Sequence, residues 1–194
     1  LGNTVWKLLS QTHVFRKHPF ASTEELNEMK IELVEENHLI NNAKRIGLDS
    51  VITQIDENPR RLISALYALI GASYLSGGLS EATKMCNKFD LCDYQKEDAD
   101  LQIPDSHTKY VWQTKLPHIP DIERRIGYTF RRKQWLVEAF THPAMTSLNY
   151  TRLAFIGDAV LDLIVTEATF IPFPDLSPSE MNKIRERSVN NTAY

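Results

Sequence analysis

The sequence predicts an all-α fold, and three observations lead to that class. Apolar residues recur at helical spacing over most of the chain, whereas no stretch alternates apolar and polar residues as a half-buried strand does. Residues that start and stop helices punctuate the apolar runs. The length of 194 residues, with 42% hydrophobic and 24% charged residues, fits a globular protein of one large domain or two small ones.

The N-terminal part is predicted to form a succession of helices. The apolar face of the first helix is formed by Val5, Leu8 and Leu9. His18-Pro19 ends this helix, because proline cannot continue one. Ser22 and Glu25 have the spacing of a capping box, which predicts the start of a second helix. A third, short helix is predicted over residues 41–46.

The longest apolar element of the first half is predicted to begin at Pro59-Arg60. Its sequence from Leu62 to Ala72 is apolar nearly all round, so we expect this helix to be central to the core. Gly77-Gly78 is expected to end it, because glycine readily adopts the backbone conformations that follow a helix.

Residues 90–120 are predicted to be a linker. The segment combines an acidic run with three prolines: Asp90, Asp93, Glu97, Asp98, Asp100, Pro104, Pro117 and Pro120. Prolines discourage regular structure, and the acidic run is interpreted as a solvated loop without a specific partner. A short extended piece is predicted at residues 110–112.

Helices are predicted to resume at Asp121. The expected elements are 121–128, 134–140 and a long helix that opens at Tyr150. Pro172 and Pro174 end the long helix, and Ser177 with Glu180 starts another that has proline in its first turn.

An internal repeat divides the chain. A shift of 155 residues (157 − 2) aligns residues 157–189 with residues 2–34 without a gap. The matched pairs include Gly157 with Gly2, Val160 with Val5, Leu163 with Leu8, Phe170 with Phe15, Pro174 with Pro19, Ser177 with Ser22, Glu180 with Glu25, Asn182 with Asn27 and Val189 with Val34. A shared glycine, proline, helix cap and capping glutamate are harder to match by chance than apolar residues. The sequence therefore predicts two incomplete copies of one helical domain, at residues 1–89 and 121–194, joined by the linker at 90–120.

Charge and targeting signals limit the partners and the location. A net charge of −3 requires any nucleic-acid contact to come from a local basic patch. The apolar run from residue 153 is the best candidate for a membrane span, but Asp158, Asp162 and Glu167 interrupt it, so no membrane association is expected. No secretory signal opens the sequence, and two cysteines without further ligands do not make a zinc site. An intracellular location is expected, in the cytoplasm or nucleus, with the mitochondrion as an alternative.

The start of the long helix resembles the signature of the ribonuclease III family of double-stranded-RNA endonucleases. That pattern reads Glu, a basic residue, Leu, Glu, Phe, an aliphatic residue, Gly and Asp. The matching residues are Arg152, Leu153, Phe155, Ile156, Gly157 and Asp158. Thr151 and Ala154 replace the two glutamates.

The resemblance extends to both copies. Residues 64–72 resemble the family's second motif, Asp-x-x-Glu-Ala-Leu-Ile-Gly, and residues 126–130 and 141–143 resemble its opening helices. The first copy is thus expected to lack its start and the second its end, as in a fragment or processed product. Two such domains in one chain are similar to the arrangement in Dicer and Drosha, which implies an internal pseudo-dimer. Incomplete domains expose apolar surface, so a further protein partner or self-association is also expected.

The resemblance implies Mg²⁺ as cofactor, held by two carboxylates from each motif of one domain. Residues 154 and 158 are four apart and therefore share one helix face. Asp158 is the one carboxylate that matches in this chain, and it is the candidate catalytic and metal-binding residue. The residues at the other positions that correspond to the family's carboxylates are neutral: Asn3, Ser64, Tyr67 and Ala154. Productive binding of Mg²⁺ and cleavage of RNA are therefore not expected. Natural decay and a deliberate glutamate-to-alanine change both remain open for Ala154.

Three functions follow as hypotheses. The first is the tandem ribonuclease III module of a Dicer-like protein that processes double-stranded RNA, with impaired catalysis. The second is a non-catalytic scaffold that binds RNA or protein, as ribonuclease III-like components of mitochondrial ribosomes do. The third is an all-α interaction module without an RNA role, which the signature disfavours.

Candidate RNA-binding residues lie in two basic clusters. The clusters comprise Arg124, Arg125, Arg131, Arg132 and Lys133, and then Lys183, Arg185 and Arg187. Of these, Arg124, Arg125, Lys183 and Arg185 are the main candidates for phosphate contacts across an A-form minor groove. A solvated helix face is the alternative for each of them.

Overall fold

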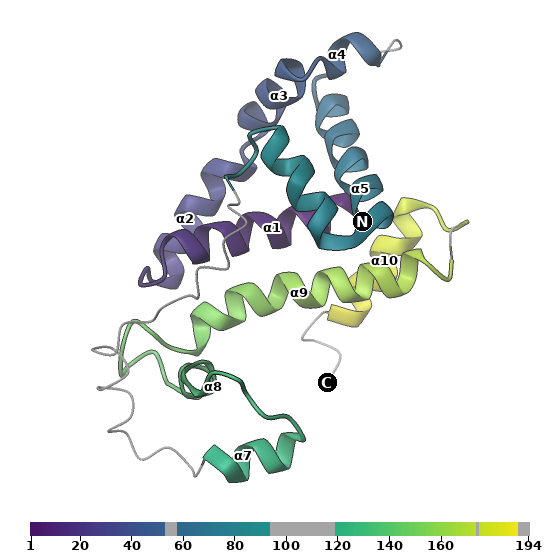
Figure 1. Ribbon diagram of the computed structural model, residues 1–194. Coiled ribbons are helices and arrows are strands. Elements are labelled where there is room, and N and C mark those ends of the chain that lie inside the picture. The colour runs from purple at the N-terminus through teal and green to yellow at the C-terminus, as the bar shows by residue number, and fades with distance from the viewer. Residues whose placement is uncertain (53–57, 94–118, 174, 190–194) are drawn as a thin grey trace.

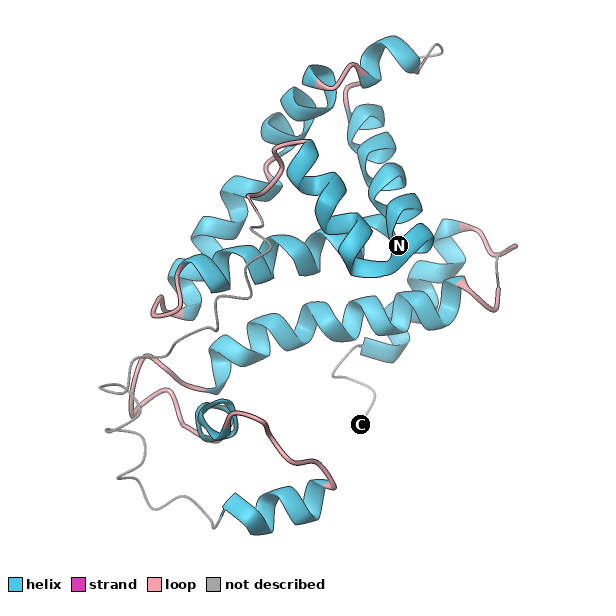
Figure 2. Cartoon of the chain, in the orientation of Figure 1, coloured by secondary structure: helices cyan, strands magenta, loops and turns pink. Residues whose placement is uncertain are grey.

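The computed structural model describes residues 1–52, 58–93, 119–173 and 175–189. Every regular element in these ranges is a helix (Figure 2). The predicted all-α class is confirmed. The extended piece predicted at residues 110–112 and most of the linker lie outside the described ranges.

Two groups of helices make up the fold (Figure 1). The first group comprises α1 (Gly2–Lys17), α2 (Thr23–Val34), α3 (Glu36–Arg45), α4 (Leu48–Val51) and α5 (Arg60–Lys88). The second comprises α7 (Ile119–Ile126), α8 (Lys133–Ala139), α9 (Tyr150–Phe170) and α10 (Pro178–Val189). Helix α1 packs against α5 on one side and against α9 on the other. It therefore joins the two groups.

The main core forms where α1 meets α5. Val5, Trp6 and Leu9 are buried on α1, and Leu66 and Ile70 are buried on α5. The removal of this apolar surface from water is the main source of stability of the packed helices.

The two helix backbones come unusually close at Gly2. A Cβ atom added there would lie 1.7 Å from the Tyr67 carbonyl oxygen and 2.9 Å from the Gly71 amide nitrogen. Any side chain at position 2 would therefore separate α1 from α5, since a backbone carbonyl cannot rotate away as a side chain can.

Three sequence predictions need correction. Helix α3 starts at Glu36, five residues before the predicted start at 41, because its first turn is polar and mostly exposed. The helix predicted at 121–128 is α7, which starts at Ile119 and ends at Ile126. Gly77-Gly78 does bend the chain, with non-helical backbone angles at both residues, but helical structure resumes and buries Ala82 and Cys86.

Helix α5 is also less central than its composition suggested. Leu62, Leu66 and Ile70 are buried, whereas Ser64, Ala68 and Ala72 on the opposite face are exposed. Among the described residues α5, and not the signature helix, is the one helix long and apolar enough to span a membrane. Since α5 covers the core with one face, we describe it as a core helix. The absence of membrane association remains a prediction.

The internal repeat is visible in the structure. Adding 155 to the bounds of α2 gives the bounds of α10 (23 + 155 = 178 and 34 + 155 = 189). Both helices begin with the same capping box. The amide nitrogen of Ser22 lies 2.7 Å from Glu25 Oε2, and that of Ser177 lies 2.9 Å from Glu180 Oε2. Helix α1 occupies the register of α9, and the two run side by side in opposite directions (Figure 1).

Candidate functional site

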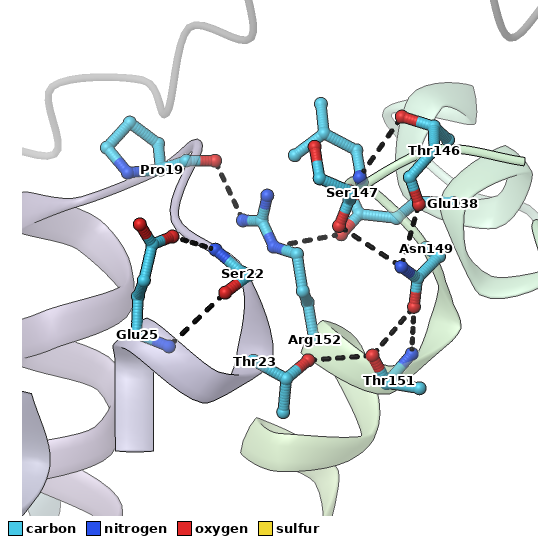
Figure 3. Close-up of polar contacts among 11 residues, drawn as sticks. Pro19, Ser22, Thr23, Glu25, Glu138, Thr146, Ser147, Asn149, Thr151 and Arg152 are labelled. Carbon is cyan, nitrogen blue, oxygen red and sulfur yellow. Dashed lines mark hydrogen bonds and ion pairs between the residues drawn. The ribbon is translucent and has the colours of Figure 1, made fainter. Parts of the chain in front are cut away.

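The signature segment forms the first turns of α9, next to the start of α2. Asn149 caps the helix, because its side-chain oxygen accepts a hydrogen bond from the Thr151 amide at 3.0 Å. The hydroxyl groups of Thr151 and Thr23 lie 2.7 Å apart and hydrogen-bond across the two copies (Figure 3). Thr151, which replaces a glutamate of the signature, thus contacts the first copy.

Arg152 is the buried polar centre of this region. Its side chain is 1% exposed, and Nη2 donates a hydrogen bond to the Pro19 carbonyl at 2.7 Å (Figure 3). Its guanidinium carbon lies 5.0 Å from the centre of the Phe15 ring, a cation–π distance. Pro19 and Phe15 belong to the first copy, so this arginine holds α9 against the end of α1.

Glu138 on α8 is the ionic partner of Arg152. Its Oε1 atom lies 3.6 Å from Arg152 Nε, and both side chains are buried. Burial raises the pKa of Glu138 to about 7, although the positive charge of Arg152 acts in the opposite direction. Burial also lowers the pKa of Arg152. A buried pair of this kind is destabilising to break, because either charge alone would be uncompensated.

Phe155 provides the apolar part of the same contact. It packs in one cluster with Val14, Phe15 and Leu26 of the first copy. The face of α9 that carries Arg152 and Phe155 therefore serves the contact between copies. Asp158 lies outside this cluster.

Asp158 and Asp162 lie one turn apart on α9 and share one cation, the ammonium group of Lys7. Lys7 Nζ is 2.6 Å from Asp158 Oδ2 and also contacts Asp162 Oδ2. The Asp158 side chain is 57% exposed, and that of Asp162 is 12% exposed. Arg185 Nη1 approaches Asp162 Oδ1 at 3.8 Å. Burial alone lowers the pKa of Lys7, but the hydrogen bonds and charges of the two aspartates outweigh it and raise that pKa.

The described residues do not fit the divalent cation that the signature implies. They contain no group of three or more Asp, Glu, His or Cys side chains placed to hold a metal ion. Ala154 offers no oxygen, although it lies one turn before Asp158 on the same helix. The Asp158 carboxylate is already paired with Lys7. Mg²⁺ requires several oxygen ligands, so Asp158 alone makes no such site.

The positions of the first copy that correspond to the family's carboxylates, Asn3, Ser64 and Tyr67, lie on α1 and α5. Asn3 follows Gly2, whose Cα packs against the Tyr67 backbone. The Ser64 hydroxyl donates to the Arg60 carbonyl at 3.2 Å within its own helix. Tyr67 is half-buried, and burial together with the charge of Glu36 raises its pKa. All three side chains are neutral at pH 7.

The four candidate RNA-binding residues do not form one patch. Arg124 and Arg125 lie on α7, whereas Lys183 and Arg185 lie on α10 in a separate part of the fold (Figure 1). Arg124 Nη1 pairs with Asp121 at 2.9 Å within α7. Arg185 is directed at Asp162, and Lys183 and Arg125 are exposed. Their contact with RNA remains a prediction.

Sequence reasoning missed Lys7, Asp162 and Glu138. The sequence did place Asp162 beside Asp158, since it lies four residues later and so shares its helix face. The repeat did relate Lys7 to this region, because the shift of 155 residues places it at the position of Asp162 (162 − 155 = 7). No signal pointed to Glu138, because a glutamate in an amphipathic helix is normally solvated.

Comparison with known proteins bears on both copies. The family model described as Ribonuclease III domain matches residues 1–78 and 151–194. The Dicer-like protein 2 of Aspergillus oryzae is 31% identical over 219 residues, which cover 98% of this chain and 16% of that protein. The Endoribonuclease Dicer homolog 3b of Oryza sativa subsp. japonica is 34% identical over 134 residues, 66% of this chain and 8% of that protein.

A third relative, Ribonuclease 3 of Homo sapiens, is 26% identical over 98% of this chain and 16% of its own length. The chain therefore spans about a sixth of the relatives that it matches over its whole length. A helical domain present twice, with a buried signature arginine at the contact between copies, defines a tandem nuclease-type fold. The chain belongs to the ribonuclease III domain family and carries two regions of that domain in tandem. The boundaries at residues 89 and 120 remain predictions.

Proposed function

We propose that this chain is the paired ribonuclease III module of a Dicer-like protein that processes double-stranded RNA, and that its candidate cation sites are impaired. The module itself is supported by the family match over both copies and by relatives named Dicer-like protein 2 and Endoribonuclease Dicer homolog 3b.

The contact between Lys7 and Asp158 carries the second part of the proposal. A divalent cation at Asp158 would have to displace the ammonium group, which lies 2.6 Å from the carboxylate and also binds Asp162. The alanine at position 154 leaves the cation without the glutamate oxygen of the signature. A two-metal mechanism needs carboxylates to offset the charge of both ions. Asp158 alone supplies one negative charge, and the ammonium group of Lys7 offsets part of it.

The first copy supports the same conclusion from different residues. Asn3, Ser64 and Tyr67 offer an amide, a hydroxyl and a phenol where the family resemblance implies carboxylates. The hydroxyl of Ser64 is used within α5, and Tyr67 stays protonated because its pKa is raised. None of these groups offsets the charge of a divalent cation at pH 7.

The proposed RNA contacts are electrostatic. Lys183 and Arg125 are both exposed, so each is open to contact with phosphates. Lysine and arginine bind duplex RNA chiefly through phosphates, with little dependence on sequence. An intracellular location agrees with such a substrate and with the free thiols of Cys86 and Cys92.

Further partners are also proposed. Leu161 and Ile164 on α9 are each 55% exposed, whereas the equivalent residues of the first copy, Trp6 and Leu9, are buried against α5. An apolar strip of this kind favours contact with a protein partner or with a second copy of the chain.

A cleavage assay with the purified chain tests the proposal. End-labelled double-stranded RNA of about 30 base pairs is incubated with Mg²⁺ or Mn²⁺, and binding is measured in parallel by gel shift with Lys183→Glu as a charge-reversal control. We expect binding that weakens with salt and with Lys183→Glu, and no cleavage. Staggered products that disappear with Asp158→Ala would contradict the impaired sites, and absence of binding would contradict the RNA module.

A non-catalytic scaffold is the second candidate. It is favoured by the contrast between neutral residues at the cation positions and an intact contact between copies through Arg152 and Phe155. In this case the Ala154→Glu variant would not cleave RNA. Cleavage of RNA by that variant would identify a nuclease that is inactive because of the alanine at position 154.

A further inference from the structure

Lys7 and Asp162 lie on the pseudo-two-fold axis that relates the two copies. They are the same position of the repeat (162 − 155 = 7), and their side chains contact each other. In a two-fold arrangement, a residue that contacts its own equivalent must lie at the axis. The antiparallel register agrees, since Arg152 at the start of α9 meets Phe15 near the end of α1.

The charges around this axis differ between the copies. The first copy contributes Lys7 from α1 and Lys30 from α2, whereas the second contributes Asp158 and Asp162 from α9 and Arg185 from α10. Lys30 and Arg185 are again equivalent positions (185 − 155 = 30), and both are basic. The equivalent of Asp158 is Asn3, which is neutral (158 − 155 = 3). Among these three equivalent pairs, the sign of the charge reverses at the axial pair.

We propose that Lys7 and Asp162 form a charge-based recognition pair, by which the first copy selects the second copy as its partner in preference to another first copy. A contact between two first copies would place Lys7 against Lys7. One between two second copies would place Asp162 against Asp162, next to both Asp158 carboxylates. The inference requires the paired arrangement of the domains and is independent of any nuclease activity.

Partial burial makes the selection effective. The Lys7 side chain is 28% exposed and that of Asp162 is 12% exposed, so solvent screens the pair less than a surface ion pair. Like charges held at this separation disfavour the wrong pairing, which is how charged positions set partner choice in other paired helices.

A mixing experiment with the full chain tests this pair. The Lys7→Asp chain carries aspartate at both axial positions, and the Asp162→Lys chain carries lysine at both. Neither can form the opposite-charge pair at positions 7 and 162 within one chain, although Lys7 of the Asp162→Lys chain keeps its contact with Asp158. Each copy of one variant complements a copy of the other at the axis. The two chains are labelled with different isotopes, unfolded in urea, refolded together and examined by native mass spectrometry.

We expect mixed dimers in roughly tenfold excess over either same-variant dimer, since a tenfold ratio requires only a modest difference in free energy. The excess should shrink in about 1 M salt, which screens the pair. If a single variant fails to fold alone, refolding with its complement should recover folded mixed dimers. Monomers only, or mixed and same-variant dimers in the statistical ratio, would overturn the inference.

Reversal of an ion pair within one copy is the matched control. Arg60 and Glu36 pair across α5 and α3, with Arg60 Nη2 at 3.3 Å from Glu36 Oε1 and both side chains exposed. Mixing the Arg60→Glu and Glu36→Arg chains should give no excess of mixed dimers. An excess there equal to that of the axial variants would show that charge reversal alone causes association.

Discussion

Lys7 and Asp162 occupy one position of a helical repeat, yet they carry opposite charges and bind each other across the contact between the copies. The same lysine also binds Asp158, the aspartate of the ribonuclease III signature. A single side chain from the first copy therefore pairs with both carboxylates that α9 presents to it. Four predictions follow from this contact and from the packing around it.

Cation binding should improve when Lys7 is neutralised and Ala154 becomes acidic. Lys7→Met frees Asp158 while keeping an apolar stem, and Ala154→Glu adds a carboxylate one turn away on the same face. We expect Mn²⁺ to bind the double variant at least roughly tenfold more tightly than the wild type, because one carboxylate is added and the competing ammonium group is removed. Isothermal titration calorimetry measures this directly. Addition of Asp158→Asn should remove the gain, and equal affinity of wild type and double variant would refute the prediction.

The glycines at equivalent positions should respond in opposite directions. Gly2→Ala places a Cβ 1.7 Å from the Tyr67 carbonyl oxygen, so α1 and α5 must separate. We expect a loss on the order of 3 kcal/mol in the free energy of unfolding, as for other overpacked sites. Gly157→Ala has no atom within 4 Å of the added Cβ and should be neutral or stabilise by up to about 1 kcal/mol. Urea denaturation of both variants is the measurement; equal losses would show that α1 and α5 do not approach as described.

Stability should fall as the pH rises through the titration range of Glu138. Its pKa is about 7 in the folded protein, compared with an ordinary value of 4.5. Between these values the folded state retains a proton that the unfolded state has released, so raising the pH favours unfolding. The loss should be on the order of 3 kcal/mol and complete about one pH unit above the folded pKa of about 7. Urea denaturation from pH 4.5 to 8 would show it.

The matched control for this pH dependence is Glu138→Gln, which cannot titrate and has nearly the same shape. The difference in stability between wild type and Glu138→Gln should become less favourable to the wild type as the pH rises. A difference that is constant with pH would mean that Glu138 titrates normally.

The two capping boxes should contribute similarly to their helices. Ser22→Ala and Ser177→Ala each remove the acceptor for a backbone amide three residues later, and we expect each to cost about 0.5–2 kcal/mol. Unfolding measured by circular dichroism gives both values. Thr23→Ala is a useful contrast, since it removes the hydrogen bond to Thr151 between copies while leaving the box of α2 in place. No loss in either serine variant would argue against the caps.

Local features of the fold were readable in the sequence because they depend on residues close together in the chain. Two capping boxes predict the starts of helices through hydrogen bonds that span three residues, one between Ser22 and Glu25 and one between Ser177 and Glu180. Pro19 and Pro172 end helices through their own backbone chemistry. The repeat followed from comparing such local signals at two places. The start of α3 was missed because polar residues carry no helical periodicity.

Contacts between distant residues were decided by the tertiary structure alone. A periodic pattern shows which residues share a helix face, but it does not say what covers that face. Ser64 and Ala68 on α5 are exposed because nothing described packs there, whereas Leu66, about half a turn away on the opposite face, is buried by α1. Lys7 reaches Asp158 across 151 residues of sequence, because the two copies pair in an antiparallel way. The sequence by itself determined the family, the helices and the neutral residues at the cation positions. Only the packing of α1 on α9 decided that a lysine binds the remaining aspartate, since that contact requires both copies to be folded and docked.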